Sequence, residues 1–209
     1  MTVDSDTEPL AGLWPLFGLV IQTPALRLRL PREEDLPALA GAACDIAGPG
    51  ESWHLILAVF AGGEPVGVQN VWAGDFARCR SVGTGSWITR SRQGRGYGTE
   101  ARAAVLQLAF GHLGALEAHT EYLDGNRASE RVSRKLGYTP NGQHAVYRDD
   151  AGRVTEYRLC LDRRAWEASA RRDGITVNGL GPCAPLFGLA SPGTAEAPGT
   201  LPRDEWDQP

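Results

Sequence analysis

Hydrophobic and polar positions follow two different periods along the chain. Short apolar runs bounded by turn residues are typical of strands, and they are predicted near residues 26–30, 54–60, 64–72, 79–89, 117–123, 143–147 and 154–161. Apolar residues recur near helical spacing elsewhere, which predicts helices near residues 33–41, 99–114, 126–135 and 162–171. Antiparallel hairpins followed by strand, helix and strand predict an α+β fold with helices against a mixed, mostly antiparallel sheet.

The same pattern divides the chain into a domain and two extensions. We expect residues 1–22 to be an N-terminal extension, 23–171 the domain, and 172–209 a C-terminal extension. Beyond Leu189 the chain is rich in proline and glycine, so this part is expected to be partly disordered. The segment Pro-Leu-Phe-Gly-Leu occurs at residues 15–19 and again at 185–189. The two copies either cover sheet edges, form a contact in a homodimer, or coincide by chance.

Composition agrees with a globular protein and excludes several classes of partner. The 209 residues are 42% hydrophobic and 22% charged, which is enough to build one substantial core. A net charge of −4 argues against nucleic acid or an anionic membrane as a partner. The four cysteines lack CxxC spacing and the four histidines lack metal-ligand spacing, so neither a disulfide framework nor a metal is expected. No targeting or membrane-spanning segment is recognisable, so a cytoplasmic location is expected.

The most informative segment is a glycine-rich loop at residues 92–99, Arg-Gln-Gly-Arg-Gly-Tyr-Gly-Thr. Three alternate glycines allow a ligand to approach the backbone, and the helix that follows offers free N–H groups to an anion. Arg92 and Arg95 can add charge-assisted hydrogen bonds. The loop matches neither a P-loop nor a dinucleotide fingerprint, because no Gly-Lys-Ser/Thr closes it and Thr99 replaces the last glycine. It therefore predicts a diphosphate site, with an ordinary glycine-rich turn as the alternative.

A second motif occupies residues 124–138, Asp-Gly-Asn-Arg-Ala-Ser-Glu-Arg-Val-Ser-Arg-Lys-Leu-Gly-Tyr. Asp124 or Asn126 can cap a short helix, and Gly137 can end it in a left-handed conformation. With both motifs in order, the chain resembles the GNAT N-acetyltransferase superfamily, and most closely its RimJ/RimL-like branch. The resemblance covers residues 23–166 and implies a sheet with splayed central strands and an acyl-coenzyme A (acyl-CoA) co-substrate.

The resemblance also implies roles for particular residues. The backbone near Trp87, Ile88 and Thr89 would hold the pantetheine and polarise the thioester, and Asn126 would bind the pantetheine arm. Either Ser129 or Tyr138 would donate a proton to the sulfur. The pyrophosphate would lie against Gln93, Gly94, Arg95, Gly96, Tyr97, Gly98 and Thr99. Each residue also has a plainer interpretation: Asn126 as a helix cap, Ser129 as a first-turn residue, and Tyr138 as a core aromatic.

The general base is the weakest part of the resemblance. Many relatives carry a glutamate on the fourth strand, where this chain has Gly83 or Thr84. Alternatives are a water molecule or one of His119, Glu121, Asp124, His144 and Glu156. The segment between the first and second predicted strands, residues 31–53, is also shorter than the two-helix lid of relatives, which leaves an open pocket or one completed by another subunit.

The chemistry that follows is direct attack of an amine on the thioester in a ternary complex. Acetyl is the expected acyl group, with succinyl as a larger alternative. The acceptor would be a small-molecule amine, a protein N-terminus or a side-chain amine. Two further alternatives are transfer to a hydroxyl group and a CoA-binding sensor or pseudoenzyme without turnover.

Overall fold

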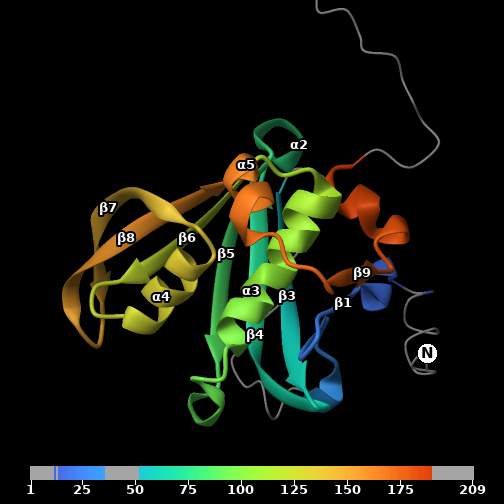
Figure 1. Cartoon of the computed structure of the whole chain (residues 1–209), viewed down its shortest axis with the longest axis horizontal. Helices are drawn as coiled ribbons and strands as arrows, with labels where there is room; N and C mark the ends of the chain where they lie inside the picture. The colour runs from blue at the N-terminus through green and yellow to red at the C-terminus, as the bar shows by residue number, and fades with distance from the viewer. Residues whose placement is uncertain (1–11, 13, 36–51, 190–209) are drawn as a thin grey trace, which may run out of the picture.

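The computed structural model describes residues 12, 14–35 and 52–189, and these form one sheet with helices against it (Figure 1). The nine strands run in the order β7-β8-β6-β5-β4-β3-β2-β1-β9. Neighbouring strands are antiparallel except for β5 and β6, so the mixed, mostly antiparallel sheet is confirmed. The strands are β1 Val20–Gln22, β2 Arg27–Arg29, β3 Ser52–Ala61, β4 Glu64–Gly74, β5 Ser81–Ile88, β6 Glu117–Leu123, β7 Thr139–Arg148, β8 Gly152–Asp162 and β9 Thr176–Asn178.

The helices are mostly short. Two of them matter for the site, α3 (Tyr97–Leu106) and α4 (Arg127–Lys135). The α3 helix continues as the π-helical η4 (Gln107–Leu113). The others are η1 Pro15–Gly18, η2 Glu33–Asp35, α2 Phe76–Cys79, η3 Arg90–Arg92, α5 Arg163–Ala165, η5 Trp166–Ala170 and η6 Gly181–Phe187. No helix within the described ranges has both the length and the apolar character that crossing a bilayer requires.

The predicted elements and the structure differ at a few places. The strand expected from residue 79 begins at Ser81, because residues 76–79 form α2 between two left-handed residues, Asp75 and Arg80. The strand β7 covers residues 139–148 and is longer than the predicted 143–147. Its first residues escaped prediction because an irregularity between Pro140 and Gln143 breaks the alternation. Of the helix expected over residues 33–41, only the turn η2 falls among the described residues.

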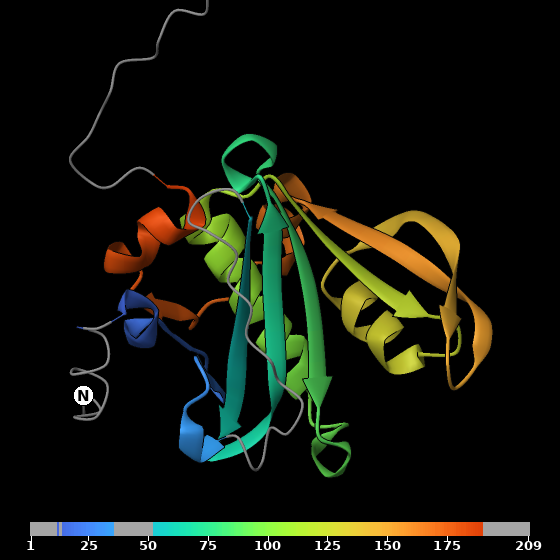
Figure 2. The ribbon, with the colours of Figure 1, turned by 180° about the vertical axis from the view of Figure 1, so that it is seen from behind.

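The central strands separate, as the resemblance implied. Pairing between β5 and β6 is limited to residues 81–83 against 117–119, although both strands continue beyond it. Two side chains hold the last point of contact: the Thr84 hydroxyl donates to the His119 carbonyl (3.1 Å), and the Thr120 hydroxyl donates to the Thr84 carbonyl (2.9 Å). Beyond this point the strands open into a V, visible in both ribbon views (Figures 1 and 2).

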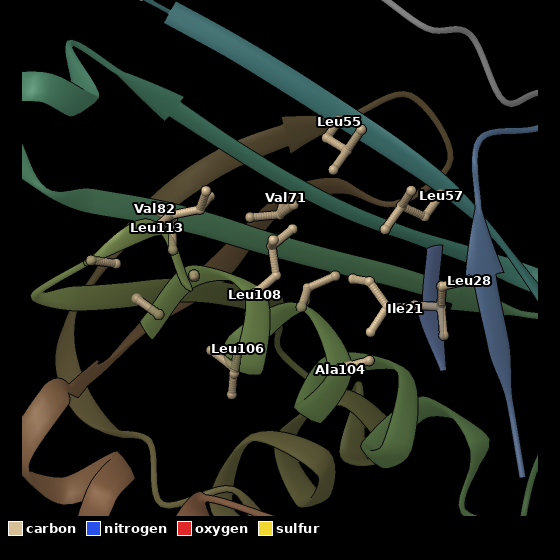
Figure 3. Close-up of a cluster of buried hydrophobic side chains, with 14 of the residues drawn as sticks. Ile21, Leu28, Leu55, Leu57, Val71, Val82, Ala104, Leu106, Leu108 and Leu113 are labelled. Atoms are coloured by element: carbon tan, nitrogen blue, oxygen red, sulfur yellow. The ribbon is translucent and has the colours of Figure 1, made fainter. Parts of the chain in front are cut away.

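The main core lies between α3 with η4 and one face of the sheet. Figure 3 shows Leu108 of this helix next to Val71 of β4, with Leu55 and Leu57 of β3 beyond it, and all of these are buried. Because apolar surface removed from water contributes about 25 cal/mol per Å², this contact is a major stabilising term for the sheet. It also fixes the start of α3 against the end of β5, where the glycine loop lies.

The two copies of the repeated segment lie against each other at one end of the sheet. η1 contains the first four residues of the first copy and η6 ends within the second, and Leu16, Leu19 and Phe187 all belong to the core. Phe187 makes an edge-to-face contact with Trp53, with ring centroids 5.0 Å apart. Parts of both predicted extensions therefore join the sheet, as β1 and β9. The division into a domain and extensions stays a prediction, and the disorder expected past residue 189 lies outside the described residues.

Candidate functional site

A cavity of about 460 Å³ opens where β5 ends and α3 begins. Its walls are the last residues of β5, the glycine loop, the first turns of α3 and one side of α4. Both motifs singled out in the sequence therefore line one space. Its lining residues include Arg92, Arg102, Arg131 and Lys135 and contain no aspartate or glutamate, so the cavity has a strongly positive wall.

The backbone of the loop explains its glycines. Gly94 and Gly96 adopt φ values of 78° and 87°, and a Cβ atom at either position would meet nothing within 4 Å. The Gly96 carbonyl accepts hydrogen bonds from the amides of Thr99 and Glu100, both at 3.0 Å, which starts α3. The amides of Tyr97 and Gly98 are the helix's first N–H groups and have no acceptor within the helix. Such groups, with the positive end of the helix dipole, form an anion site.

The second wall is built from α4. The Asn126 side chain caps this helix by accepting a hydrogen bond from the Ser129 amide at 3.1 Å. The plain interpretation of Asn126 is thus correct, and the residue lines the cavity as well. Glu130 lies outside the lining and is bound by Arg127 (3.0 Å) and Arg134 (3.1 Å), which lower the pKa of its carboxyl. The acid of this helix is therefore occupied and does not neutralise the cavity.

Arg102 is the one lining cation that is fully buried, with 2% of its surface exposed. It donates to the Ser133 hydroxyl at 2.8 Å and to the Ser86 hydroxyl at 3.2 Å, while its Nε has no partner. No carboxylate of the described residues pairs with it, and burial lowers the pKa of the guanidinium. Arg102 was not among the residues predicted from the sequence. Its position one turn after Gly98 in an otherwise apolar helical stretch was the available signal.

Most of the site residues predicted from the sequence line this cavity: of the twelve predicted to bind acyl-CoA two do not, and neither does the predicted catalytic Tyr138. The lining set contains Trp87, Ile88, Gln93, Gly94, Gly96, Tyr97, Gly98, Thr99, Asn126 and Ser129. Thr89 and Arg95 lie outside it, and so does Tyr138. The tyrosine is 4% exposed and its hydroxyl lies 3.1 Å from the Thr84 hydroxyl. Burial raises the pKa of this phenol, so its position matches that of a core aromatic.

A second hollow of about 390 Å³ lies at the paired start of β5 and β6. Trp72, Gly83, His119 and Glu121 are among its lining residues. The imidazole of His119 is 3.1 Å from the Glu117 carboxylate, which can orient it. A Cβ atom at Gly83 would lie 2.2 Å from Cε2 of Trp72. The indole therefore fills the space in which a side chain would begin at residue 83, one of the two positions aligned with the relatives' glutamate.

The other candidate bases lie elsewhere. Asp124 accepts a hydrogen bond from the Gly125 amide (3.0 Å) in the turn before α4. His144 and Glu156 are 3.4 Å apart on β7 and β8. Burial and the neighbouring Glu121 carboxylate raise the pKa of Glu156. Of the five candidates, His119 and Glu121 alone line the second hollow.

Comparison with known proteins agrees with this arrangement. Residues 42–139 match a family model described as an acetyltransferase (GNAT) domain. The matched stretch contains both the glycine loop at residues 92–99 and the second motif at residues 124–138. This match confirms the superfamily inferred from the two motifs, and it supports acyl-CoA-dependent N-acyltransferase activity in general, with an acyl-CoA co-substrate and an amine acceptor.

Solved structures share the GNAT fold at low sequence identity. They include RimJ of Mycobacterium smegmatis in complex with CoA-disulfide, at 19% identity and TM-score 0.57, where the match covers 75% of this chain and 92% of that chain. A GNAT acetyltransferase from Bacillus anthracis matches at 16% identity and TM-score 0.58, over 69% and 99% of the two chains. A GCN5-related N-acetyltransferase from Brucella melitensis matches at 15% identity and TM-score 0.58, over 71% and 80%.

Proposed function

We propose that this protein, as a RimJ/RimL-like GNAT enzyme, transfers an acyl group from acyl-CoA to an amine by direct attack. The observation that carries the proposal is the positive cavity at the open end of the V, where loop amides, a helix N-terminus and cations converge. A diphosphate requires such a set of donors. The reaction needs no covalent intermediate, because positioning and stabilisation of the oxyanion supply the main terms.

The donor would bind with its diphosphate on the amides of residues 94–98 and its pantetheine along β5. Beyond residue 83 the edge of β5 that faces β6 has no strand partner, so its backbone can hydrogen-bond the pantetheine amides. Trp87 and Ile88 line the cavity on this path, and Asn126 and Ser129 face it from α4. The thioester would then lie near the point where the two strands part. A cytoplasmic location suits this reaction, and Cys79, Cys160 and Cys183 are free thiols, as a reducing compartment favours.

Ser129 is our proposed proton donor to the departing sulfur. Ser129→Ala is expected to lower kcat about tenfold with little change in donor affinity, because water in an open cavity takes over part of the transfer. Steady-state kinetics and calorimetric titration measure the two quantities. Tyr138→Phe is the control, since its hydroxyl is buried on Thr84, and it should keep nearly full kcat. If the tyrosine variant loses activity and the serine variant keeps it, the roles are reversed.

The amine would approach from the second hollow, with His119 as the base that accepts its proton. His119→Gln is expected to lower kcat about tenfold while leaving the affinity for acyl-CoA unchanged, because the histidine lines the hollow and not the donor cavity. The matched control is His144→Gln, in which the histidine lies on β7 outside both cavities. Equal activity of the native protein and His119→Gln would leave water as the proton acceptor.

A CoA-binding sensor is the second candidate, favoured by one observation: Trp72 fills the space beside Gly83, one of the two positions aligned with the relatives' glutamate. The deciding experiment follows release of free thiol from acyl-CoA in the presence of a panel of small amines, peptides with free N-termini and hydroxyl compounds. Turnover with an amine supports the enzyme. Tight donor binding without turnover across the panel supports the sensor, and turnover with hydroxyl compounds alone would change the acceptor class.

A further inference from the structure

Arg102 occupies a position that the proposed acetyl donor does not explain. The other cations of the cavity wall, Arg92, Arg131 and Lys135, are at least partly open to solvent and can meet the phosphates of CoA. Arg102 is buried, and its hydrogen-bond partners are two neutral hydroxyl groups. A buried guanidinium without an anion is costly, because desolvation of the charge is not repaid. The arrangement therefore calls for an anionic ligand group inside the cavity.

The position of Arg102 indicates which end of the donor carries that anion. Its contact on β5 is Ser86, which lies between the loop end of the strand at Ile88 and the parting point at Gly83. Its contact on α4 is Ser133, one turn beyond Ser129. The guanidinium thus lies deeper than the loop that would hold the diphosphate. In the proposed binding mode, the pantetheine and the thioester would reach this part of the cavity.

We propose that Arg102 binds the free carboxylate of a dicarboxylic acyl chain, so that the preferred donor is a succinyl-type acyl-CoA. This inference rests on the proposed function and names its substrate class. Each terminal nitrogen of Arg102 keeps one N–H beyond its bond to a serine, and such a pair of donors matches a carboxylate, which can accept two parallel N–H bonds. The hydroxyl groups of Ser86 and Ser133 hold the guanidinium in place before the ligand binds. An acetyl group offers no charge for it.

The test compares two acyl chains of equal length by calorimetric titration of the full chain. Succinyl-CoA and butyryl-CoA both carry four-carbon acyl groups, and they differ in the terminal carboxylate. The native protein should bind succinyl-CoA at least about tenfold more tightly, since a hydrogen bond to a charged group contributes about 1.5–3 kcal/mol. Arg102→Met should abolish this difference and leave the affinity for free CoA unchanged. Arg102→Lys should keep part of it.

Lys135→Met is the matched control for the phosphates. Removal of this exposed cation should lower the affinity for succinyl-CoA, butyryl-CoA and CoA by the same factor. Equal affinity of the native protein for the two acyl chains would overturn the inference without need of any variant. A preference for succinyl-CoA that survives in Arg102→Met would also overturn it. An equal loss of affinity for all three ligands in this variant would overturn it too, because it would assign Arg102 to the phosphates. If the native protein binds none of the three, the proposed function fails as well.

Discussion

Gly96→Val is expected to weaken binding of acyl-CoA about a hundredfold while the domain stays folded. Gly96 has a φ of 87°, and its carbonyl anchors the first turn of α3. A β-branched residue is strained in this conformation, so the loop would relax and turn its amides away from the diphosphate. Loss of two hydrogen bonds to a charged group, at about 1.5 kcal/mol each, corresponds to roughly a hundredfold in affinity. Calorimetric titration with acetyl-CoA and CoA measures the effect.

Gly62→Val is the control for Gly96→Val, because it introduces similar backbone strain at a position away from the donor cavity. Gly62 lies in the hairpin between β3 and β4 with a φ of 60°, and a Cβ atom there would also meet nothing within 4 Å. Both substitutions should lower the melting temperature to a similar extent, because the backbone penalty is the same kind in each. The hairpin lies outside the donor cavity, so this variant should keep native affinity. Native affinity in Gly96→Val would remove the loop from the donor site.

The sequence predicted the elements whose evidence is local. The strand at residues 117–123 was found at its observed bounds, and the helix at residues 126–135 was placed within one residue, because a cap and a terminal glycine mark it. The glycine loop was found for the same reason, since its residues are contiguous. Strands β1 and β9 were missed. Each has three residues and is defined by its neighbours across the sheet.

The rest of the candidate site depends on residues that meet only in three dimensions. Arg102 is recognisable as a site residue only through its contacts with Ser86 on β5 and Ser133 on α4. The sequence separation between Arg102 and either serine does not indicate an anion site. The absence of the relatives' glutamate can also be understood only in three dimensions. Gly83 gives no hint in the sequence of why the position is small, whereas the structure puts the indole of Trp72 over it. A tryptophan on an adjacent antiparallel strand is invisible until the register is known.

The buried Arg102 and the position of Trp72 over Gly83 together bear on the chemistry. Trp72 covers Gly83, one of the two positions on β5 aligned with the relatives' glutamate, and His119 with its Glu117 partner lies across the parallel pair at the same level. The proton path would then run on the β6 side of the V, and the acyl chain would lie on the side of Arg102. Substrate choice and proton transfer are thereby assigned to different residues, so variants can separate them: Arg102 variants should change donor preference and His119 variants should change kcat.

Gly67→Ala is expected to destabilise the protein by about 3 kcal/mol, at the upper end of the usual cost of overpacking. A Cβ atom at this position would lie 2.2 Å from the Trp87 carbonyl oxygen and 2.9 Å from Cα of Ile88. Both obstacles are backbone, so no side-chain rotation relieves them. The strands β4 and β5 must move apart at the register that pairs Gly67 with Ile88. For a chain of this length the melting temperature should fall by roughly 6–12 °C.

The same displacement should reach the donor site, because Trp87 and Ile88 line its cavity. We therefore expect Gly67→Ala to weaken acyl-CoA binding even at temperatures at which it remains folded. Gly181→Ala is the control: a Cβ atom there would meet nothing within 4 Å, so stability and affinity should both stay near native. Thermal unfolding followed by circular dichroism and calorimetric titration give the two readouts. A Gly67→Ala protein with native stability would mean that β4 and β5 are not packed this closely, and the path assigned to the pantetheine along β5 would have to be redrawn.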